Sequence, residues 1–428
     1  MARKILIAPL GTGPNFGKRQ AREYPKATYR IDGIDYPDSK FIASVLYQHL
    51  ELDGIYFIGT ARSMWEEAYR FFCEQTGIAL DEDYWVYLAE TAANSNHKSS
   101  SNWIDLSKLE AVLGKHSKCI PVEYGIDEKQ IWNNLDRIIE SISDLQKKDE
   151  IYIDITHAFR SLSLFQFLTI NFINDLLSER EIKVRGVYYG MLELNRDDEL
   201  GYAPIVDLSP LLEMMHWIKA SYSLKNFGNG YLISDLLKQQ NEEKLAKQIW
   251  QLSDAININY VTAIGNRSID IQQIIDQNDA QGAFKHIKPQ LEEFSSKFAT
   301  NASDSRRSNF QLKLANWYFQ NRRYATGYIT LAEAIVTHVC EHLNRDINNF
   351  NAREEVKDQL TQNREENQDI FKTPLAELYR TIAHIRNAIS HASFGTTNRT
   401  PSFHNAIENA QTYSDRVEKI FEGKKLGN

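Results

Sequence analysis

Residues 150–177, EIYIDITHAFRSLSLFQFLTINFINDLL, decide the fold class of the chain. Glu150 to Ile155 is an almost continuous apolar run, which predicts a strand buried on both faces. From Leu162 to Leu177 apolar side chains return with the period of a helix. A buried strand that passes through a short polar turn into a helix is the repeating unit of a parallel sheet covered by helices.

The same alternation extends over about the first 200 residues. Strands are predicted at residues 4–10, 54–60, 84–88, 119–124, 150–155, 184–193 and 203–208, and helices at 41–52, 63–77, 131–145 and 162–177. Residues 14–37 are predicted to form a long polar loop, and the Ser- and Asn-rich residues 92–102 a mobile one. We therefore expect a Rossmann-like α/β domain whose mostly parallel sheet carries helices on both faces.

The pattern changes after Ser209-Pro210, where strand signals end. Helices are predicted at residues 211–225, 231–252, 254–275, 283–299, 307–320, 324–344, 353–363, 374–392 and 403–422. We expect the α/β domain to span residues 1–208 and an all-α domain to span residues 209–428.

Composition restricts the classes of function. The 428 residues are 42% hydrophobic and 25% charged, which is typical of a soluble globular protein. A net charge of −8 and a pI near 5.8 argue against a protein that coats nucleic acid through many phosphate contacts. Three distant cysteines indicate neither disulfides nor a zinc site, and we predict buried thiols. No stretch approaches the length of a membrane span, so we expect a cytoplasmic protein.

Small polar residues follow three of the predicted parallel strands. Ligands bind beyond the carboxyl ends of such strands, where loop N–H groups and helix N-termini face outward. We predict that a phosphate-bearing ligand binds there, and the candidate residues are Gly11, Thr12, Gly13, Thr60, Ser63, Thr156, His157 and Arg160. The spacing of Gly11, Gly13 and Gly17 departs by one residue from a dinucleotide fingerprint, and Pro14 interrupts the helix that should follow, so we do not expect NAD. The alternatives are turn geometry for the glycines and a structural role for His157.

A second candidate site lies in residues 375–394, LAELYRTIAHIRNAISHASF. At about 100° per residue, the apolar side chains form one face of a helix, and Arg380, His384, Asn387 and His391 form a polar stripe. Arg386 lies roughly 140° around the helix from His391, so a regular helix would not aim both at one point. A distorted helix end or a second copy of the chain would bring them together. An imidazole that moves the proton of a 2′-hydroxyl and a guanidinium that holds a phosphate suit RNA cleavage without a metal. The alternative is a solvated helix face.

The chain resembles the CARF–HEPN proteins of type III CRISPR systems over nearly its whole length. The resemblance rests on Ile153–Ser161 (IDITHAFRS), on Ile58–Trp65 (IGTARSMW), on Ile205–Leu211 (IVDLSPL) and on the Arg-Asn-x-x-x-His spacing of residues 386–391. The Asp-Ile-Thr-His-x-Phe-Arg-Ser run is particular to one branch of that family. The resemblance implies a CARF domain over residues 1–208 and an all-helical HEPN domain over residues 209–428.

This resemblance also implies a function. Members are homodimers, and whether higher oligomers form is open. Their CARF domains bind a cyclic oligoadenylate as activator, with cyclic tetra- or hexa-adenylate expected here, and their HEPN domains cut single-stranded RNA without a metal. The family motif places Arg386, Asn387 and His391 in the catalytic site. The ring size, the RNA preference and any cleavage of the ring by His157 are not readable from the sequence.

Three alternatives stay open at this stage. The HEPN domain could be inactive and serve only for dimerisation in a ligand-sensing regulator, or it could act as a nucleotidyl transferase or as a toxin on one particular RNA. Separately, Arg306-Arg307 and Arg322-Arg323 bracket the aromatic run Trp317-Tyr318-Phe319, which could stack on RNA or belong to the core.

Overall fold

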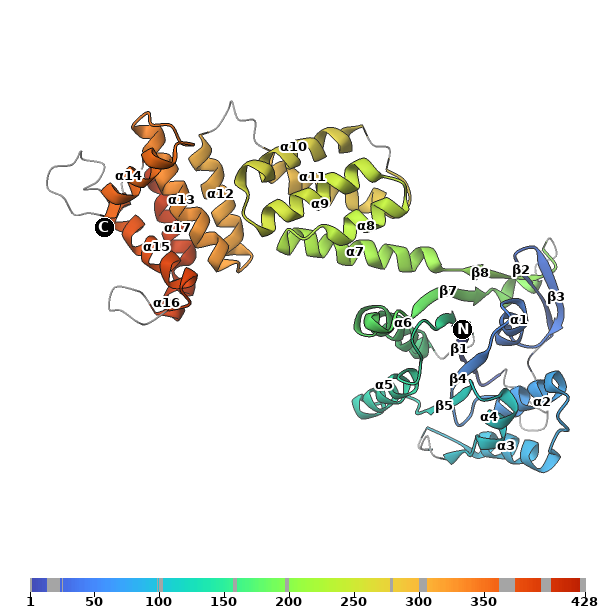
Figure 1. The fold of residues 1–428 in the computed structure, drawn as a ribbon. Coiled ribbons are helices and arrows are strands. Elements are labelled where there is room, and N and C mark those ends of the chain that lie inside the picture. The colour runs from blue at the N-terminus through green and yellow to red at the C-terminus, as the bar shows by residue number, and fades with distance from the viewer. Residues whose placement is uncertain are drawn as a thin grey trace. The chain divides into compact units, whose positions relative to one another are not determined.

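The computed structural model describes residues 2–13, 24, 26–97, 99, 103–156, 160–196, 200–277, 280–299, 306–361, 374–393 and 402–423, with the backbone alone at 160–163 and 196. The chain divides into two compact units, Met1–Leu212 and Glu213–Asn428. This division falls four residues beyond the domain boundary expected after residue 208. Figure 1 shows the strands in the first unit and helices throughout the second.

The first unit is built on a sheet with strand order β3-β2-β8-β7-β6-β1-β4-β5. Its strands are β1 (Lys4–Pro9), β2 (Ala27–Ile31), β3 (Ile34–Ser39), β4 (Gly54–Thr60), β5 (Lys118–Val122), β6 (Glu150–Asp154), β7 (Lys183–Gly190) and β8 (Ala203–Asp207). The run from β5 to β7 is parallel, β8 is antiparallel to β7, and β2 with β3 forms an antiparallel hairpin. The predicted α/β class with a mostly parallel sheet is confirmed.

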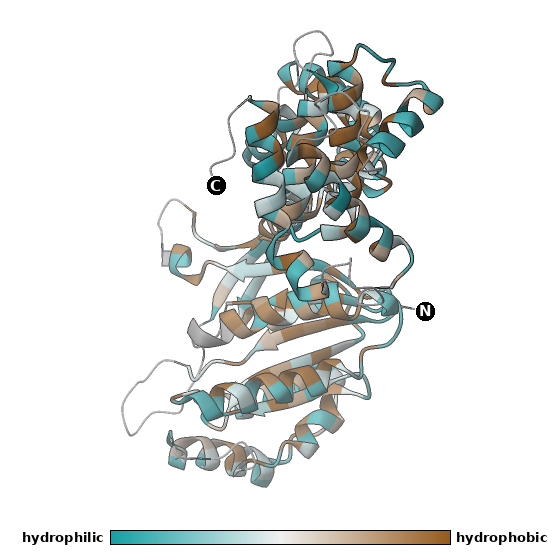
Figure 2. Cartoon of the chain, turned by 90° about the vertical axis from the view of Figure 1, so that its left-hand side faces the viewer, coloured by the Kyte–Doolittle hydropathy of each residue, from teal (hydrophilic) through white to brown (hydrophobic). Residues whose placement is uncertain are grey.

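Helices cover both faces of this sheet. They are α1 (Ile42–His49), α2 (Trp65–Thr76), α3 (Glu82–Asn94), α4 (Ser107–Leu113), α5 (Glu128–Ile142) and α6 (Arg160–Leu176), with 3₁₀ turns at Ser178–Arg180 and Leu192–Arg196. Leu6 and Phe57 share a buried core with α1 to α4, whereas α5 and α6 pack together on the opposite face. The strands between these layers are coloured mostly as apolar in Figure 2, as expected of strands buried on both faces.

Residues 84–88 belong to α3, so the strand predicted there is wrong. The Asp81 carboxylate accepts a hydrogen bond from the Tyr84 N–H at 3.1 Å and caps this helix. Tyr84, Leu88 and Ala92 are buried at a spacing of four residues, which is a helical period. The aromatic residues in between favour strands, and they obscured this helical period in the sequence. The loop predicted at 92–102 starts within this helix, and residues 98 and 100–102 lie outside the described part.

A hairpin occupies part of the polar loop predicted at 14–37, which corrects that prediction. β2 and β3 are joined by Asp32 and Gly33, whose φ angles are 49° and 78°. Two positive φ angles in a row are typical of the tight hairpin turn for which Asp-Gly is a strong signal. That signal was missed because β3 has no buried residue and therefore shows no apolar alternation. Residues 14–23 and 25 lie outside the described part.

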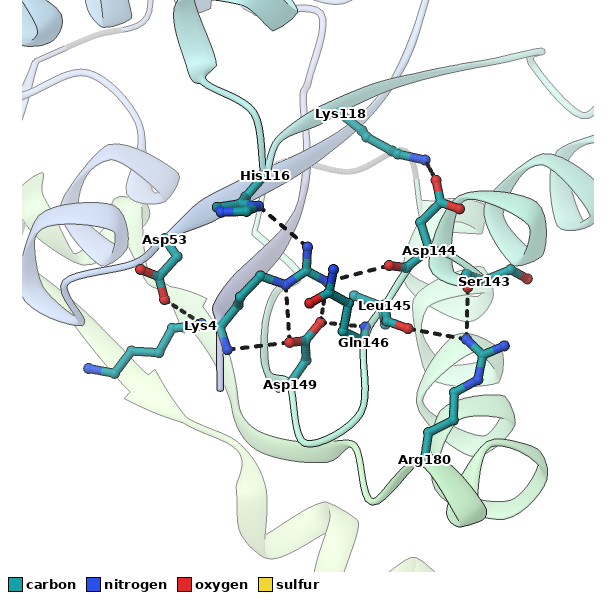
Figure 3. A network of polar contacts seen from close by, with 11 residues as sticks. Lys4, Asp53, His116, Lys118, Ser143, Asp144, Leu145, Gln146, Asp149 and Arg180 are labelled. Carbon is teal, nitrogen blue, oxygen red and sulfur yellow. Dashed lines mark hydrogen bonds and ion pairs between the residues drawn. The ribbon is translucent and has the colours of Figure 1, made fainter. Parts of the chain in front are cut away.

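The edge of the sheet at which β1 and β6 begin is fastened by an ion pair. Arg3 donates from Nε to Asp149 Oδ1 at 3.1 Å, and its Nη2 lies 2.5 Å from Oδ2 (Figure 3). Asp149 is 1% exposed and also accepts from the Gln146 N–H at 2.7 Å. Because residues 3 and 149 directly precede β1 and β6, this pair holds the two central strands together. The opposite edge, where these strands end, carries the candidate ligand loops.

The second unit consists of helices in the residues that the structure describes. They are α7, which begins at the end of the first unit (Ser209–Phe227), α8 (Tyr231–Gln239), α9 (Glu243–Asn257), α10 (Val261–Asp276), α11 (Phe284–Phe298), α12 (Arg307–Gln320), α13 (Tyr324–His342), α14 (Phe350–Thr361), α15 (Pro374–Ser390), α16 (Phe403–Glu408) and α17 (Ala410–Phe421). Two single helices predicted at 231–252 and 403–422 are each divided, into α8 with α9 and α16 with α17. The predicted all-α class of this part is confirmed.

Two hydrophobic cores lie within this second unit, and α12 contributes to both. Leu314 and Trp317 belong to a core with α7 to α11, whereas Leu312 and Phe319 belong to a core with α13 to α17. Trp317, Tyr318 and Phe319 are all buried. The aromatic run that could have stacked on RNA is therefore core, because a helix packed on two sides uses nearly its whole circumference for burial.

Candidate functional site

The three candidate ligand loops of the first unit follow neighbouring strands. β1 pairs with β6 on one side and with β4 on the other, in parallel. The loops that follow these strands, beginning at Leu10, Ala61 and Ile155, therefore emerge at one edge of the sheet. This is the position at which parallel sheets bind ligands.

The loop after β1 is shaped by contacts with Met64. The Gly11 carbonyl accepts hydrogen bonds from the Met64 N–H at 2.9 Å and from the Tyr24 hydroxyl at 3.1 Å. Gly13 has a φ of 68°, and a Cβ there would lie 2.1 Å from Met64 Sδ. Glycine is needed at this position for both reasons. The Thr12 side chain is partly exposed beside it and is available to a ligand.

Thr60 and Ser63 hold the second loop from inside. The Ser63 hydroxyl accepts from the Thr60 N–H at 3.0 Å, and the Trp65 indole donates to the Thr60 carbonyl at 2.8 Å. The two side chains are 1% and 0% exposed, so neither is presented to a ligand in this arrangement. Burial was not predictable from residue type, because hydroxyl side chains occur both in loops and beneath them.

The third loop is tied to β7. The Thr156 hydroxyl accepts from the Gly190 N–H at 2.9 Å, and the Thr156 N–H donates to Asp154 Oδ1 at 2.8 Å. Arg160 is the first residue of α6, and only its backbone is described. His157 lies outside the described residues.

Asp154 is a buried acid that the sequence reasoning did not single out as a site residue. It is 0% exposed, and its Oδ2 has no hydrogen-bond partner in the described part of the chain. Burial raises the pKa of this carboxyl to about 7, against the opposing effect of the hydrogen bonds from Thr156. Its position at the end of an apolar strand was the available signal. Strongly shifted pKa values are frequent at functional sites, so we count Asp154 among the candidates.

The second candidate site lies at the end of α15. The buried face of this helix includes Leu378, Ile382 and Ile385, as the predicted periodicity required. Arg386 is partly exposed, and Asn387 and His391 are exposed. The three residues are therefore on the surface of the second unit, next to the core that α13 to α17 share.

A side-chain contact draws the Arg386 guanidinium toward Asn387. Arg386 donates to Asn387 Oδ1 from Nη2 at 2.9 Å and from Nε at 3.3 Å. Asn387 and His391 are four residues apart and lie on the same face of the helix. By leaning toward Asn387, the guanidinium turns toward the side of the helix on which His391 lies.

The helix also ends at this place. The His391 N–H donates to the Asn387 carbonyl at 2.9 Å, and the Ser393 N–H donates to the Ala388 carbonyl at 2.9 Å. Between them Ala392 has a φ of 48°, which closes the helix in a left-handed turn. The imidazole thus stands on the terminal turn of α15. A distorted helix end was one of the two arrangements expected from the sequence.

Glu333 connects Arg386 to further cations and was missed in the sequence. Its Oε1 lies 3.9 Å from Arg386 Nη1 and 3.4 Å from Lys357 Nζ, and its Oε2 lies 2.5 Å from Arg353 Nη2. Burial alone would raise the pKa of the Glu333 carboxyl, but Lys357 and Arg353 outweigh it and lower that pKa. One carboxylate thus orders three cations from two helices. The residues are far apart in sequence, so only packing reveals the cluster.

No group of three or more His, Cys, Asp or Glu side chains placed to hold a metal ion occurs among the residues that the structure describes. Likewise, none of the helices in the described ranges has the length and apolar character to cross a lipid bilayer.

Comparison with known protein families identifies two matches. Residues 5–193 match the CARF domain of the CRISPR system endoribonuclease Csx1, and residues 213–305 match the second domain of CRISPR-associated protein MJ1674. The first unit is thus similar to a CARF domain over most of its length, and the chain is similar to CRISPR-associated proteins. Helices α12 to α17, which include Arg386 and His391, lie outside both matched ranges.

Two individual proteins are similar to the chain. The chain is 34% identical over 405 residues to CRISPR-associated protein MJ1674 of Methanocaldococcus jannaschii, covering 91% of this chain and 62% of that protein. It therefore spans about three fifths of that relative's length. It is also similar to the structure of Enterococcus italicus Csm6 bound to cyclic hexa-2′-fluoro-hexa-dAMP, with 13% identity, a TM-score of 0.37 and coverage of 100% of this chain and 96% of that chain.

Proposed function

We propose that this chain is a cyclic-oligoadenylate-activated single-strand endoribonuclease of type III CRISPR defence, with its catalytic site in a HEPN domain near the C-terminus. The carrying observation is the end of α15, where Arg386, Asn387 and His391 lie at the surface and Arg386 donates to Asn387. The match of residues 5–193 to a CARF domain supports ligand sensing by the first unit. The name of that family, an endoribonuclease, supports the reaction.

The chemistry follows from the two side chains. The 2′-hydroxyl of a ribose attacks the adjacent phosphorus, and the bond from phosphorus to the 5′-oxygen of the next nucleotide breaks. The products are a 2′,3′-cyclic phosphate and a 5′-hydroxyl. Arg386 stabilises the charge on the phosphate oxygens. His391 either moves the proton or helps to hold the phosphate.

The activator site is proposed at the edge of the sheet where β1, β4 and β6 end. Thr12 and the loops that follow β1 and β6 supply N–H groups and hydroxyls for phosphates. His157 and Arg160 are the further candidates, and Arg160 is the first residue of α6. A ligand there switches on the second unit only if it binds the active arrangement more tightly than the resting one. The proposed homodimer would bring two copies of Arg386 and His391 into one cleft.

Cleavage of a fluorescent single-stranded RNA tests this proposal. The reaction is run in EDTA with cyclic tri-, tetra- and hexa-adenylate added separately. We expect one ring size to switch on cleavage, and we expect His391→Ala and Arg386→Ala to lower the rate by at least about a hundredfold, since each removes a group that acts in the transition state. A DNA strand of the same sequence is the control and should stay intact.

Two results would contradict the proposal. Cleavage that needs a divalent metal would contradict the metal-independent mechanism. Unchanged cleavage by His391→Ala would contradict the assignment of the catalytic site. If no ring triggers cleavage while one of them binds, a ligand-sensing regulator with an inactive helical domain becomes the better description.

A further inference from the structure

A cavity of about 250 Å³ lies among α10, α12, α13 and α14 of the second unit, and its lining residues include none of the candidate site residues. Figure 1 shows α12, α13 and α14 side by side. The polar groups that line the cavity come from four separate segments and include Thr262, Arg307, Gln311, Thr337, Asn348 and Arg353. Two guanidinium groups and two hydroxyls thus face one small space.

No ion pair with an acid is found for Arg307 among the residues that the structure describes. It is half-buried, and the contact found for it is a hydrogen bond from Nη2 to Thr262 Oγ1 at 2.5 Å. Glu341, whose charge acts on Arg307, accepts from the Ser308 N–H at 3.2 Å and from the Ser308 hydroxyl at 2.6 Å. Burial, and then the charge of Arg353, lower the pKa of the Arg307 guanidinium. Arg353 is paired with Glu333, whereas the partly desolvated charge of Arg307, which lines the same cavity, has no such pair in the described residues and is costly without an anion.

Gln311 adds an unpartnered polar group to the wall of the cavity. It is 7% exposed, and its Oε1 has no hydrogen-bond partner among the described residues. Buried carboxamides are normally bonded, so such an atom calls for an explanation. An amide oxygen accepts from a hydroxyl, and a ribose carries that donor beside its phosphate.

Arg353 ties the cavity to the catalytic candidates. Its Nη1 donates to Thr337 Oγ1 and to the Ile347 carbonyl, each at 3.1 Å, while its Nη2 holds Glu333. Glu333 in turn lies within 3.9 Å of Arg386. The guanidinium is 16% exposed and held on one side, which leaves it oriented rather than mobile. A ligand bound at Arg353 would thus contact a residue that shares a carboxylate with Arg386.

We propose that this cavity binds the phosphate group of a ribonucleotide, held by Arg307 and Arg353. A forked guanidinium matches phosphate oxygens, and the Thr262 hydroxyl, which accepts from Arg307, can donate to a remaining one. The volume accommodates a phosphate with its sugar and is small for a whole nucleotide with its base. The ligand is either a segment of an RNA strand or a free nucleotide. Binding here does not require the chain to cleave RNA.

The test uses the full chain with His391→Ala, so that bound RNA stays intact, and its integrity is checked on a gel. A labelled single-stranded RNA is titrated by fluorescence anisotropy, and AMP by calorimetry. Arg307→Gln is compared with Arg345→Gln, which removes one positive charge from the same unit at an exposed ion pair with Glu355. We expect Arg307→Gln to weaken at least one ligand about tenfold or more, and Arg345→Gln to change neither more than about twofold.

The RNA and AMP titrations distinguish the two possible ligands, an RNA strand and a free nucleotide. Weaker RNA binding with AMP unaffected identifies an RNA strand, and weaker AMP binding identifies a free nucleotide. If Arg307→Gln leaves both affinities equal to those of Arg345→Gln, the inference is overturned. Should Arg307→Gln unfold, Arg307→Lys keeps the charge, loses the fork and should weaken binding by a smaller factor. Because affinities are measured, failure here is distinct from failure to cleave RNA.

Discussion

At the scale of single residues, Glu333 is the side chain on which the order around Arg386 depends. Replacing it by Gln leaves Arg353, Lys357 and Arg386 without their shared carboxylate. We expect Glu333→Gln to lower the free energy of unfolding at pH 7 by roughly 1–3 kcal/mol. Equilibrium unfolding in urea measures this. Glu355→Gln, at an exposed pair, should change stability by less than about 0.5 kcal/mol.

The stability difference between wild type and Glu333→Gln should also depend on pH. The pKa of Glu333 is lowered by folding from its ordinary 4.5. Its contribution is therefore fully present above pH 4.5 and is lost as the pH falls through the lower folded pKa. The difference between wild type and Glu333→Gln should shrink on acidification below about pH 4. A difference that stays constant into strong acid would show that lost packing, and not lost charge, accounts for it.

Asp154 should give the free energy of unfolding a pH dependence of the opposite sign to that of Glu333. Folding raises the pKa of its carboxyl from 3.8 to about 7. Between those values the folded state holds the proton more tightly, so the free energy of unfolding falls as the pH rises. We expect Asp154→Asn to remove this slope and to stabilise the chain at pH 8 by roughly 1–4 kcal/mol. Thermal unfolding between pH 5 and pH 8 measures it, and a destabilised variant at pH 8 would disprove the assignment.

At the scale of elements, the loop that follows β1 depends on Gly13, which packs against Met64 at the N-terminus of α2. Gly13→Ala meets two costs, a positive φ and contact with Met64 Sδ, whereas Gly33→Ala in the β2–β3 turn meets only the first. We expect Gly33→Ala to cost about 1 kcal/mol and Gly13→Ala about 1–3 kcal/mol more. Urea unfolding compares them. Equal losses would mean that Met64 moves aside freely.

The same comparison bears on the proposed activator site. Because Gly13 lies beside Thr12 in the candidate loop, we expect Gly13→Ala, and not Gly33→Ala, to weaken binding of the cyclic oligoadenylate that activates the wild type. Calorimetry at a temperature where both variants are folded measures this. Equal affinities in the two variants would place the activator elsewhere.

At the scale of the whole molecule, the proposed homodimer predicts that inactive chains suppress active ones. If two chains form one cleft, mixing wild type with a ninefold excess of Arg386→Ala and allowing exchange puts most wild-type chains into mixed dimers. Activated RNA cleavage per wild-type chain should then fall to about a tenth, provided that mixed dimers are inactive. Bovine serum albumin in place of the variant is the control. Activity proportional to the wild-type chains alone would mean that each chain cuts independently.

The sequence by itself determined the order of elements and the class of each half. Buried strands such as 54–60 and 150–154 can be predicted from their apolar runs, because both faces of these strands are covered. Arg386, Asn387 and His391 were selected from the sequence as candidates by their spacing, and they stay a prediction. The sequence pattern misplaced 84–88 and missed the Asp32-Gly33 hairpin, since aromatic content and the absence of a buried face obscured the local signals.

Tertiary structure alone decided which groups meet. The burial of Thr60 and Ser63, the burial of the Asp154 carboxyl and the sharing of α12 between two cores depend on what packs against each residue. Glu333 reaches Arg353 and Arg386 only because α13, α14 and α15 pack together. Contacts between residues distant in sequence leave no local pattern, because their energy comes from neighbours that folding supplies.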